Sequence, residues 1–573
     1  MKLLYSLVLL LTVLVSSAQT SPFEKSGGKE TATYFEAIKW YKELDSKSPF
    51  LSLKTMGATD AGYPLHLAMV SIDGKFDPKL WHQQGKIVIL INNGIHPGEP
   101  DGIDASMMLV RDILSKKITL PANVVLAVIP VYNIGGALNR NAYTRANQNG
   151  PLEYGFRGNA QNLDLNRDFT KADSKEARSF TQIFHFLNPD ILIDNHVSDG
   201  ADFQHTMTLI ATQYDKLGST LGRFLREKFE PKLYIGMKTK GWDMIPYVDF
   251  ETTDFARGMK MFMDPPRYST GYAALFNTLA FMPETHMLKP FKERVVSTYD
   301  LMKTFIEVSS VSAAQIKKQR KNAAAEWKNA RLFPIKWKAD GTVYAEIDFK
   351  GFAKKQKESK ATGLQKMYYD HEDPFERKLK FFHKFSSEMD ILAPKAYVIP
   401  QGWHEAIDLL KLNKVNLYQL QNDTIIFVKA YRIKDYKSNA RAYEKHHKNS
   451  GVMVSDSMVK QKFLKGDYII NLNQDGNRYI VEMLEPTGDD SFFSWNFFDA
   501  ILQQKEGYSD YRWEDIAAEI LQKDTMLQQS LQTKKAADPK FANDSRAILD
   551  FIYRKSPYYE KAHLQYPVYR IEY

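Results

Sequence analysis

Between residues 30 and 310 the sequence alternates apolar, strand-like runs with amphipathic helical patterns, and this alternation constrains the fold most strongly. The apolar runs, which we expect to be buried strands, cover residues 86–93, 123–133, 190–196, 205–212 and 279–284. Strands and helices in alternation predict an α/β fold, with a mostly parallel mixed sheet that carries helices on both faces. Ligands of such sheets collect at the carboxyl ends of the strands.

The character of the chain changes after residue 310. Residues 311–331 are charged and Ala-rich, which predicts a helical linker. Beyond it, segments such as TVYAEIDF, TIIFVKAYRI and NRYIVEML alternate like antiparallel strands, and a helical segment, EDIAAEILQKDTMLQQSLQ, follows. A chain of 573 residues is too long for one ordinary domain. We therefore expect a β-rich C-terminal domain over residues 332–573, to which no motif assigns a role.

The first residues have the pattern of a secretory signal peptide. Lys2 precedes an apolar run from Leu3 to Val15, and small residues end at Ala18. The run is short for a bilayer span, so a membrane anchor is the weaker interpretation. We expect residues 1–18 to be cleaved near Ala18, giving a secreted or periplasmic protein with no stable membrane insertion.

The composition narrows the chemistry of any site. The chain has no cysteine, which excludes disulfides, thiolate metal sites and a cysteine nucleophile. A metal would have to be held by His, Asp or Glu. The net charge of +9 is spread along the chain, and the one dense basic run, KKQRKN at 317–322, is typical of a solvated helix face. We therefore expect no nucleic-acid partner.

The run KIVILINN is followed at once by GIHPGEP, which contains an H-x-x-E pair, His96 and Glu99. The pair alone is a weak signal, because a loop histidine beside a solvated glutamate gives the same pattern. Its position strengthens it, since it follows a buried strand in a loop where Gly94 and Gly98 permit tight bends and two prolines add stiffness. Imidazole and carboxylate suit zinc, and a catalytic zinc commonly takes three protein ligands plus water.

A third ligand has to come from another strand. His196 ends the apolar run at 190–196, so it can meet the first pair at one edge of the sheet. A core histidine satisfied by backbone groups is the alternative interpretation. His205 competes as a ligand, but it begins a strand instead of ending one.

Two further segments contribute polar groups. LDLNRDF at 163–169 contains Asn166 and Arg167, planar donors that suit a carboxylate. LAFMPETHM places Glu284 at a strand end, where an apolar setting can raise its pKa toward that of a working base. A surface glutamate at a strand exit is the alternative interpretation of Glu284.

Taken in this order, H-x-x-E, Asp-x-Asn-Arg, a strand-end His and a strand-end Glu resemble the zinc metallocarboxypeptidase family of the M14 type, over about residues 30–310. The resemblance implies one zinc ion per catalytic domain, held by His96, Glu99 and His196. It also implies that Asp164 supports the first histidine, as carboxylates behind metal-bound imidazoles do.

The resemblance further implies how a peptide would bind. Asn166 and Arg167 would grip the free C-terminal carboxylate of the substrate. Arg145 would stabilise the oxyanion, with Arg140 as the alternative.

For the chemical step, the resemblance implies that Glu284 acts as the general base toward zinc-activated water. A tyrosine is expected over the substrate, on the loop before the last strand. Tyr268 and Tyr272 both lie in that region.

Three functions are compatible with this pattern. The first is a secreted zinc metallocarboxypeptidase that hydrolyses C-terminal peptide bonds. The second is a zinc amidohydrolase or deacylase of related fold, acting on N-acyl amino acids or cell-wall peptides. The third is a non-catalytic binding protein, against which the complete set of zinc and base residues argues.

Overall fold

The computed structural model describes residues 19–248 and 257–573, so the expected signal peptide lies outside the described residues. The chain divides into two compact units. The first contains residues up to 330, with 336–390 and 412–414, and the second contains 331–335, 391–411 and 415–573. Within the described ranges, no helix combines the length and the apolar character needed to cross a bilayer.

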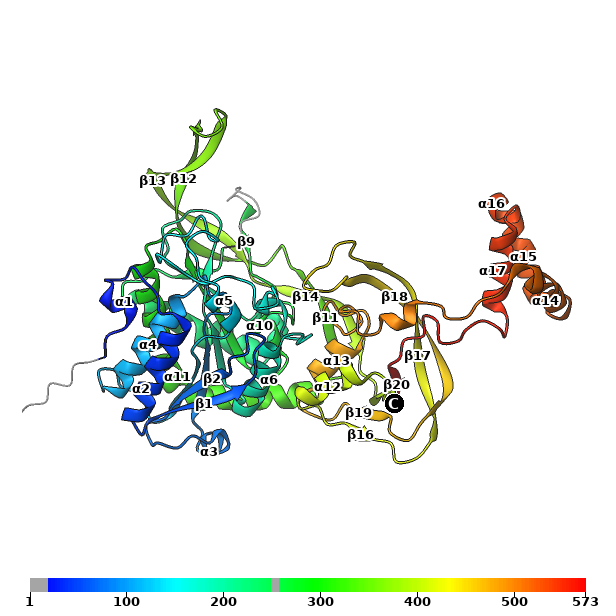
Figure 1. The fold of residues 1–573 in the computed structure, drawn as a ribbon, viewed down its shortest axis with the longest axis horizontal. Coiled ribbons are helices and arrows are strands. Elements are labelled where there is room, and N and C mark those ends of the chain that lie inside the picture. Colours follow the sequence, from blue (N-terminus) through cyan, green and yellow to red (C-terminus); the bar gives the residue numbers. More distant parts are fainter. Residues whose placement is uncertain (1–18, 249–256) are drawn as a thin grey trace, which may run out of the picture. The chain divides into compact units, whose positions relative to one another are not determined.

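The first unit is built on a mixed sheet (Figure 1). Its strands are β1 (Leu51–Gly57), β2 (Leu65–Val70), β3 (Ile87–Asn92), β4 (Val124–Ile129), β5 (Ile191–Asp194), β6 (His196–Ser198), β7 (Met207–Ala211), β8 (Ile245–Pro246) and β10 (Leu279–His286). They lie in the order β1-β2-β4-β3-β5-β10-β7-β8, and β6 pairs with β10. The central strands β4, β3, β5 and β10 are parallel, whereas β2 runs antiparallel to both of its neighbours and β7 runs antiparallel to β10 but parallel to β8. The predicted α/β fold is confirmed.

Helices cover both faces of this sheet. They are α1 (Pro22–Lys25), α2 (Tyr34–Lys47), α3 (Pro78–Gln83), α4 (Asp101–Leu114), α5 (Ile134–Leu138), α6 (Lys175–Leu187), α7 (Tyr214–Leu217), α8 (Leu221–Phe224), α9 (Glu230–Thr239), α10 (Ser269–Ala274) and α11 (Phe291–Lys328). Successive strand residues such as Val88 and Ile89 enter two separate apolar clusters, because side chains alternate across a strand. Helices α2, α4, α9 and α11 contribute to one cluster, and α3, α6 and α10 to the other.

The order of the strands places a crevice at the end of β3. This strand has β4 on one side and β5 on the other, so the connections from its end diverge in opposite directions. In open α/β sheets such a switch point is where ligands bind, outside the carboxyl ends of the strands. The H-x-x-E segment follows β3 directly, and His196 follows β5.

Residues 311–328, within the stretch expected to be a helical linker, are the continuation of one helix, α11 (Phe291–Lys328). Its first half packs into the core through Val295, Leu301 and Phe305. The Ala-rich sequence contains no helix breaker, so the helix continues to Lys328.

A long hairpin, expected within the C-terminal domain, belongs to the first unit. It consists of β12 (Ala345–Glu358) and β13 (Gln365–Phe382), and β13 pairs with β9 (Met259–Lys260). Its base carries Phe349, Leu379 and Phe381 into the large apolar cluster, while its outer part is exposed. The burial of these three residues accounts for the position of the hairpin in the first unit.

The second unit is rich in β-structure. Its strands are β15 (Ala396–Ile399), β16 (Tyr418–Gln419), β17 (Thr424–Ser438), β18 (Asn449–Phe463), β19 (Tyr468–Asn471) and β20 (Tyr569–Ile571), in the order β16-β19-β15-β20-β17-β18. Two strands, β11 (Leu332–Ala339) and β14 (Phe385–Leu392), lie where the chain passes from one unit to the other. The helices of the second unit are α12 (His404–Leu412), α13 (Asn477–Leu484), α14 (Asp510–Lys523), α15 (Thr525–Ala537), α16 (Pro539–Ala542) and α17 (Ser545–Lys555).

The segment NRYIVEML, expected as a strand, is the helix α13. All eight of its residues are buried. Its polar residues Asn477, Arg478 and Glu482 recur at helical spacing, so the segment carries a helical period that interpretation as a strand overlooked.

Candidate active site

The loop after β3 brings His96 and Glu99 together through a tight turn. The amide of Glu99 donates to the carbonyl of His96 at 2.8 Å. Gly94 has a φ of 65°, in the left-handed region that glycine adopts without strain. Gly98 leaves room for Arg145, whose Cδ would lie 2.6 Å from a Cβ at that position. Gly94 therefore has the expected role in the bend, whereas Gly98 is needed for the space that it leaves to Arg145.

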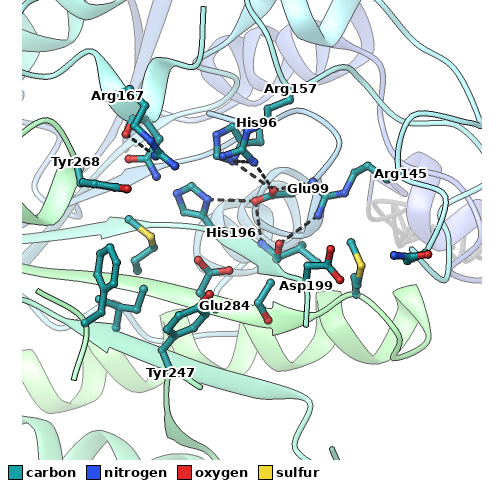
Figure 2. Close-up of a pocket in the computed structure, with 18 of the residues that line it drawn as sticks. His96, Glu99, Arg145, Arg157, Arg167, His196, Asp199, Tyr247, Tyr268 and Glu284 are labelled. Carbon is teal, nitrogen blue, oxygen red and sulfur yellow. Dashed lines mark hydrogen bonds and ion pairs between the residues drawn. The ribbon is translucent and has the colours of Figure 1, made fainter. Parts of the chain in front are cut away.

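Three side chains converge at the end of β3 and β5. Donor atoms of His96, Glu99 and His196 all lie within 4.8 Å of one another. The Nδ1 atoms of His96 and His196 lie 3.3 Å and 3.1 Å from the two carboxylate oxygens of Glu99 (Figure 2). All three residues are buried, with exposed fractions of 2%, 3% and 4%.

A carboxylate contacts the Nε2 atom of each histidine. Asp164 lies 2.8 Å from Nε2 of His96, and Asp194 lies 3.1 Å from Nε2 of His196. Each carboxylate accepts a hydrogen bond from the Nε2–H group of its histidine, so the Nδ1 atom of each ring keeps its lone pair for a metal. Two such nitrogens and one carboxylate form the donor set of a catalytic zinc site. These residues therefore fit the zinc ion that the sequence predicts.

The charges of the cluster also favour a cation. Burial would raise the pKa of Glu99, but His96 and Arg145 beside it hold that pKa well below its usual range. Burial likewise opposes ionisation of Asp164, yet His96 and Arg157 lower its pKa. Both carboxyl groups are therefore ionised at neutral pH.

Two arginines face the carboxylate of Glu99. Arg145 donates to Glu99 Oε1 at 2.8 Å and to the carbonyl of Val197 at 3.2 Å. Arg157 lies with Nη1 3.3 Å from His96 Nδ1 and with Nη2 2.8 Å from Asp164 Oδ2. Both side chains line the cavity that also contains His96, Glu99 and His196.

Arg157 and Arg140 both differ from what the sequence predicts. Arg157 was missed, although it lies in the same loop as Asp164 and seven residues before it. Arg140, the alternative to Arg145, instead donates to the carbonyl of Glu153 at 3.0 Å and does not line the cavity.

Glu284 lies on β10, directly opposite His196 on β6. Its side chain lines the same cavity (Figure 2). Burial raises the pKa of Glu284 to about 8, although His196 and Arg145 act in the opposite direction. A carboxyl group that titrates near neutral pH can both accept and return a proton.

The cavity has a volume of about 440 Å³ and also contains the Asn-Arg pair. Asn166 and Arg167 come from a short 3-10 helix (Leu165–Arg167), whose first amides are satisfied by Asp164. The guanidinium of Arg167 lies 4.3 Å from the ring centroid of Tyr268. Tyr247, which the sequence did not single out, lines the cavity as well.

Two of the predicted candidates lie elsewhere. Tyr272 is fully buried in the apolar cluster, where its hydroxyl donates to Asn413 at 2.6 Å. His205 has both ring nitrogens engaged, with the carbonyl of Asp243 at 2.7 Å and the amide of Lys350 at 3.1 Å. The structure therefore brings Tyr268 to the cavity, and His196 to the ligand cluster.

Part of the chain matches a family of known proteins. Residues 37–190 match the family model described as zinc carboxypeptidase. The matched range contains His96, Glu99, Asp164, Asn166 and Arg167. The resemblance seen in the sequence is confirmed over this range, and the enzyme class is that of a zinc metallopeptidase.

The chain also resembles solved structures at low sequence identity. A metallo-carboxypeptidase from Burkholderia cenocepacia is 15% identical, with 49% of this chain and 70% of that chain covered and a TM-score of 0.36. Carboxypeptidase A from Helicoverpa armigera is 14% identical, with 50% and 75% covered and a TM-score of 0.37. A metallo-carboxypeptidase from Pseudomonas aeruginosa, in complex with (2-guanidinoethylmercapto)succinic acid, is 14% identical, with 50% and 70% covered and a TM-score of 0.38. No curated protein matches the chain.

Proposed function

We propose that this protein is an exported, zinc-dependent metallocarboxypeptidase that removes residues from the free C-terminus of peptides. One observation carries the proposal: a single cavity contains the His96–Glu99–His196 cluster, Glu284 and the Asn166–Arg167 pair. A metal site, a base and a carboxylate clamp are the parts that hydrolysis of a terminal peptide bond requires.

The residues of the cavity have separable tasks. Asn166 and Arg167 bind the terminal carboxylate of the peptide, since a guanidinium can donate two parallel hydrogen bonds to it. Bound zinc, held by the His96–Glu99–His196 cluster, supplies Lewis acidity toward the scissile carbonyl and toward water.

Glu284 takes a proton from the attacking water and returns it to the leaving amine. Arg145 and Arg157 add positive charge beside the developing oxyanion. Both guanidinium groups are held in advance, by Glu99 and Asp164 respectively, so they need little rearrangement during the reaction.

The remaining wall of the cavity indicates which C-terminal residues fit. Among the described residues, Ile210, Phe262 and Met282 contribute apolar surface and Tyr247 and Tyr268 contribute aromatic rings, whereas Thr144, Asn147, Ser198 and Asp199 contribute polar surface. Burying a charged side chain against the apolar part of this wall without a partner is costly. We therefore expect a preference for peptides that end in neutral, apolar residues.

A library of peptides with defined C-termini tests the proposal. Each peptide is offered as a free acid and as the matched C-terminal amide, and products are identified by mass spectrometry. Successive loss of single residues from the free acids, with little from the amides, is the expected result. Internal cleavage, or release of N-acyl groups alone, contradicts the proposal, and the second outcome favours the deacylase. Protein treated with a zinc chelator is the control.

Export is tested separately. The N-terminus of the protein recovered from the extracellular or periplasmic fraction is sequenced. A mature chain that begins shortly after Ala18 is expected, whereas an intact N-terminus in the cytoplasmic fraction contradicts export.

A further inference from the structure

Arg294 occupies the first turn of α11 and is fully buried. Its guanidinium donates to six acceptor atoms. They are Asp101 Oδ2 at 3.0 Å, Asp101 Oδ1 at 3.5 Å, and the carbonyls of Asn149 at 3.1 Å, Gly150 at 2.9 Å, Met287 at 3.0 Å and Lys289 at 3.0 Å. A planar group with five N–H donors is the side chain that can join so many acceptors.

These acceptors belong to three segments, and each segment carries a residue of the candidate site. Asp101 is the first residue of α4 and follows Glu99 by two positions. Asn149 and Gly150 continue the loop of Arg145. Met287 and Lys289 continue the chain from the end of β10, beyond Glu284. One buried guanidinium therefore fixes the spacing of all three segments.

A second contact closes the same network. The hydroxyl of Thr285, the neighbour of Glu284, donates to Asp101 Oδ2 at 2.6 Å. The Arg294 Nε atom contacts the same oxygen. Asp101 thus joins the segment of the base to the segment of the Glu99 ligand, and both donors hold its carboxylate in place.

The carboxylate clamp stands apart from this network. Asn166 and Arg167 lie on the 3-10 helix after Asp164, and Asp164 caps that helix at the Asn166 amide, at 2.9 Å. A disturbance at Arg294 should therefore reach the metal ligands and the base more strongly than the clamp.

We propose that Arg294 is a positioning residue for the reaction, which acts through Asp101 to hold Glu99, Arg145 and Glu284 at working distances. This inference rests on the proposed function. Its consequence is a split: loss of the guanidinium lowers kcat and zinc affinity, whereas KM for a peptide changes little. A purely structural role would lower stability alone.

The chain offers a matched control at the other end of the same helix. Arg320 of α11 donates to Asp190 at 2.7 Å and to the carbonyl of Asn277 at 2.8 Å. These partners precede β5 and β10, at the edge of the sheet opposite to the site. Arg320 thus makes hydrogen bonds to a carboxylate and to a backbone carbonyl, as Arg294 does, but away from the chemistry.

The experiment compares Arg294→Lys with Arg320→Lys in the full-length protein. For each variant we would measure the free energy of unfolding and the zinc dissociation constant, the latter by competition with a chelator. We would also measure kcat and KM on a peptide that the wild-type protein trims. Both variants should lose stability. Only Arg294→Lys should weaken zinc binding and lower kcat, each by about 10–100-fold, with KM within about threefold of the wild type.

Equal effects of the two variants on zinc affinity and kcat would overturn the proposal. If Arg294→Lys does not fold, the Thr285→Val variant tests the same network instead, because it removes one hydroxyl at nearly constant volume. A fall in kcat with KM retained supports the network, and an unchanged kcat contradicts it. If the wild-type protein binds zinc but trims no peptide, the proposed function fails, and the zinc affinities of the variants still decide the role of Arg294.

Discussion

Glu284 on β10 lies directly opposite His196 on β6, in the register of two parallel strands. Side chains of a strand alternate between faces, so a shift of one residue in either strand would turn the base or the ligand away from the cavity. Backbone pairing thus fixes the base beside the metal ligand, although the two residues are far apart in the sequence.

Replacement of His196 by Ala should remove the metal. One of three protein ligands is lost, and the remaining pair holds zinc weakly. Elemental analysis after dialysis should find about one zinc per chain in the wild type and almost none in His196→Ala. His205→Ala is the control, because both of its ring nitrogens are engaged elsewhere, and it should retain zinc. Loss of zinc from His205→Ala alone would show that the wrong histidine has been assigned.

Glu284→Gln should keep the metal and lose turnover. The amide is nearly isosteric but cannot accept and return a proton, so kcat should fall by about 10²–10⁴-fold. Zinc content and steady-state kinetics are measured on the same preparation. Unchanged turnover with normal zinc would remove Glu284 from the mechanism.

Arg167→Lys should weaken the binding of free C-termini. A charge-assisted, bidentate contact becomes a single point contact, at a cost of about 1.5–3 kcal/mol, or roughly 10–200-fold in kcat/KM. The residual, slow cleavage of C-terminal amides should change far less, since they lack the carboxylate. Equal losses on both kinds of substrate would argue against a carboxylate clamp at Arg167.

Asp104 makes the stability of the first unit depend on pH. Burial raises the pKa of this carboxyl to about 7, although Thr31 and the amide of Ala32 hydrogen-bond to it. Because the folded form holds the proton above the pH at which the unfolded form releases it, the free energy of unfolding falls as the pH rises from about 4 to 7.

Asp104→Asn removes this titration. The difference in free energy of unfolding, variant minus wild type, should grow across that pH interval and level off above it. Denaturant titrations at a series of pH values measure the difference. A difference that is independent of pH would contradict the assigned pKa.

The sequence carried much of the candidate site. His96, Glu99, His196 and Glu284 could be identified because each stands where an apolar strand ends, and strand ends meet at one edge of a parallel sheet. Residues that act from loops without such a marker were harder to find. Arg157 looked like an ordinary polar residue until the fold placed it on the cavity wall, and the same holds for Asp194, the last residue of β5, which the fold places against Nε2 of His196.

Other features depended on packing that no local pattern encodes. Tyr268 and Tyr272 differ by about one helical turn, and only the contacts of α10 show that Tyr272 enters the core while Tyr268 meets Arg167. The hairpin of β12 and β13 alternates like any exposed strand pair. Its assignment to the first unit depends on where Phe349 and Phe381 find an apolar surface.

The most direct test of this account is a crystal structure of the zinc-loaded protein with anomalous data at the zinc edge. We predict a single zinc peak at about 2.0–2.2 Å from Nδ1 of His96, a carboxylate oxygen of Glu99 and Nδ1 of His196, with one position open to solvent beside Glu284. A peak outside the cavity, or one that excludes any of these three residues, would contradict the account.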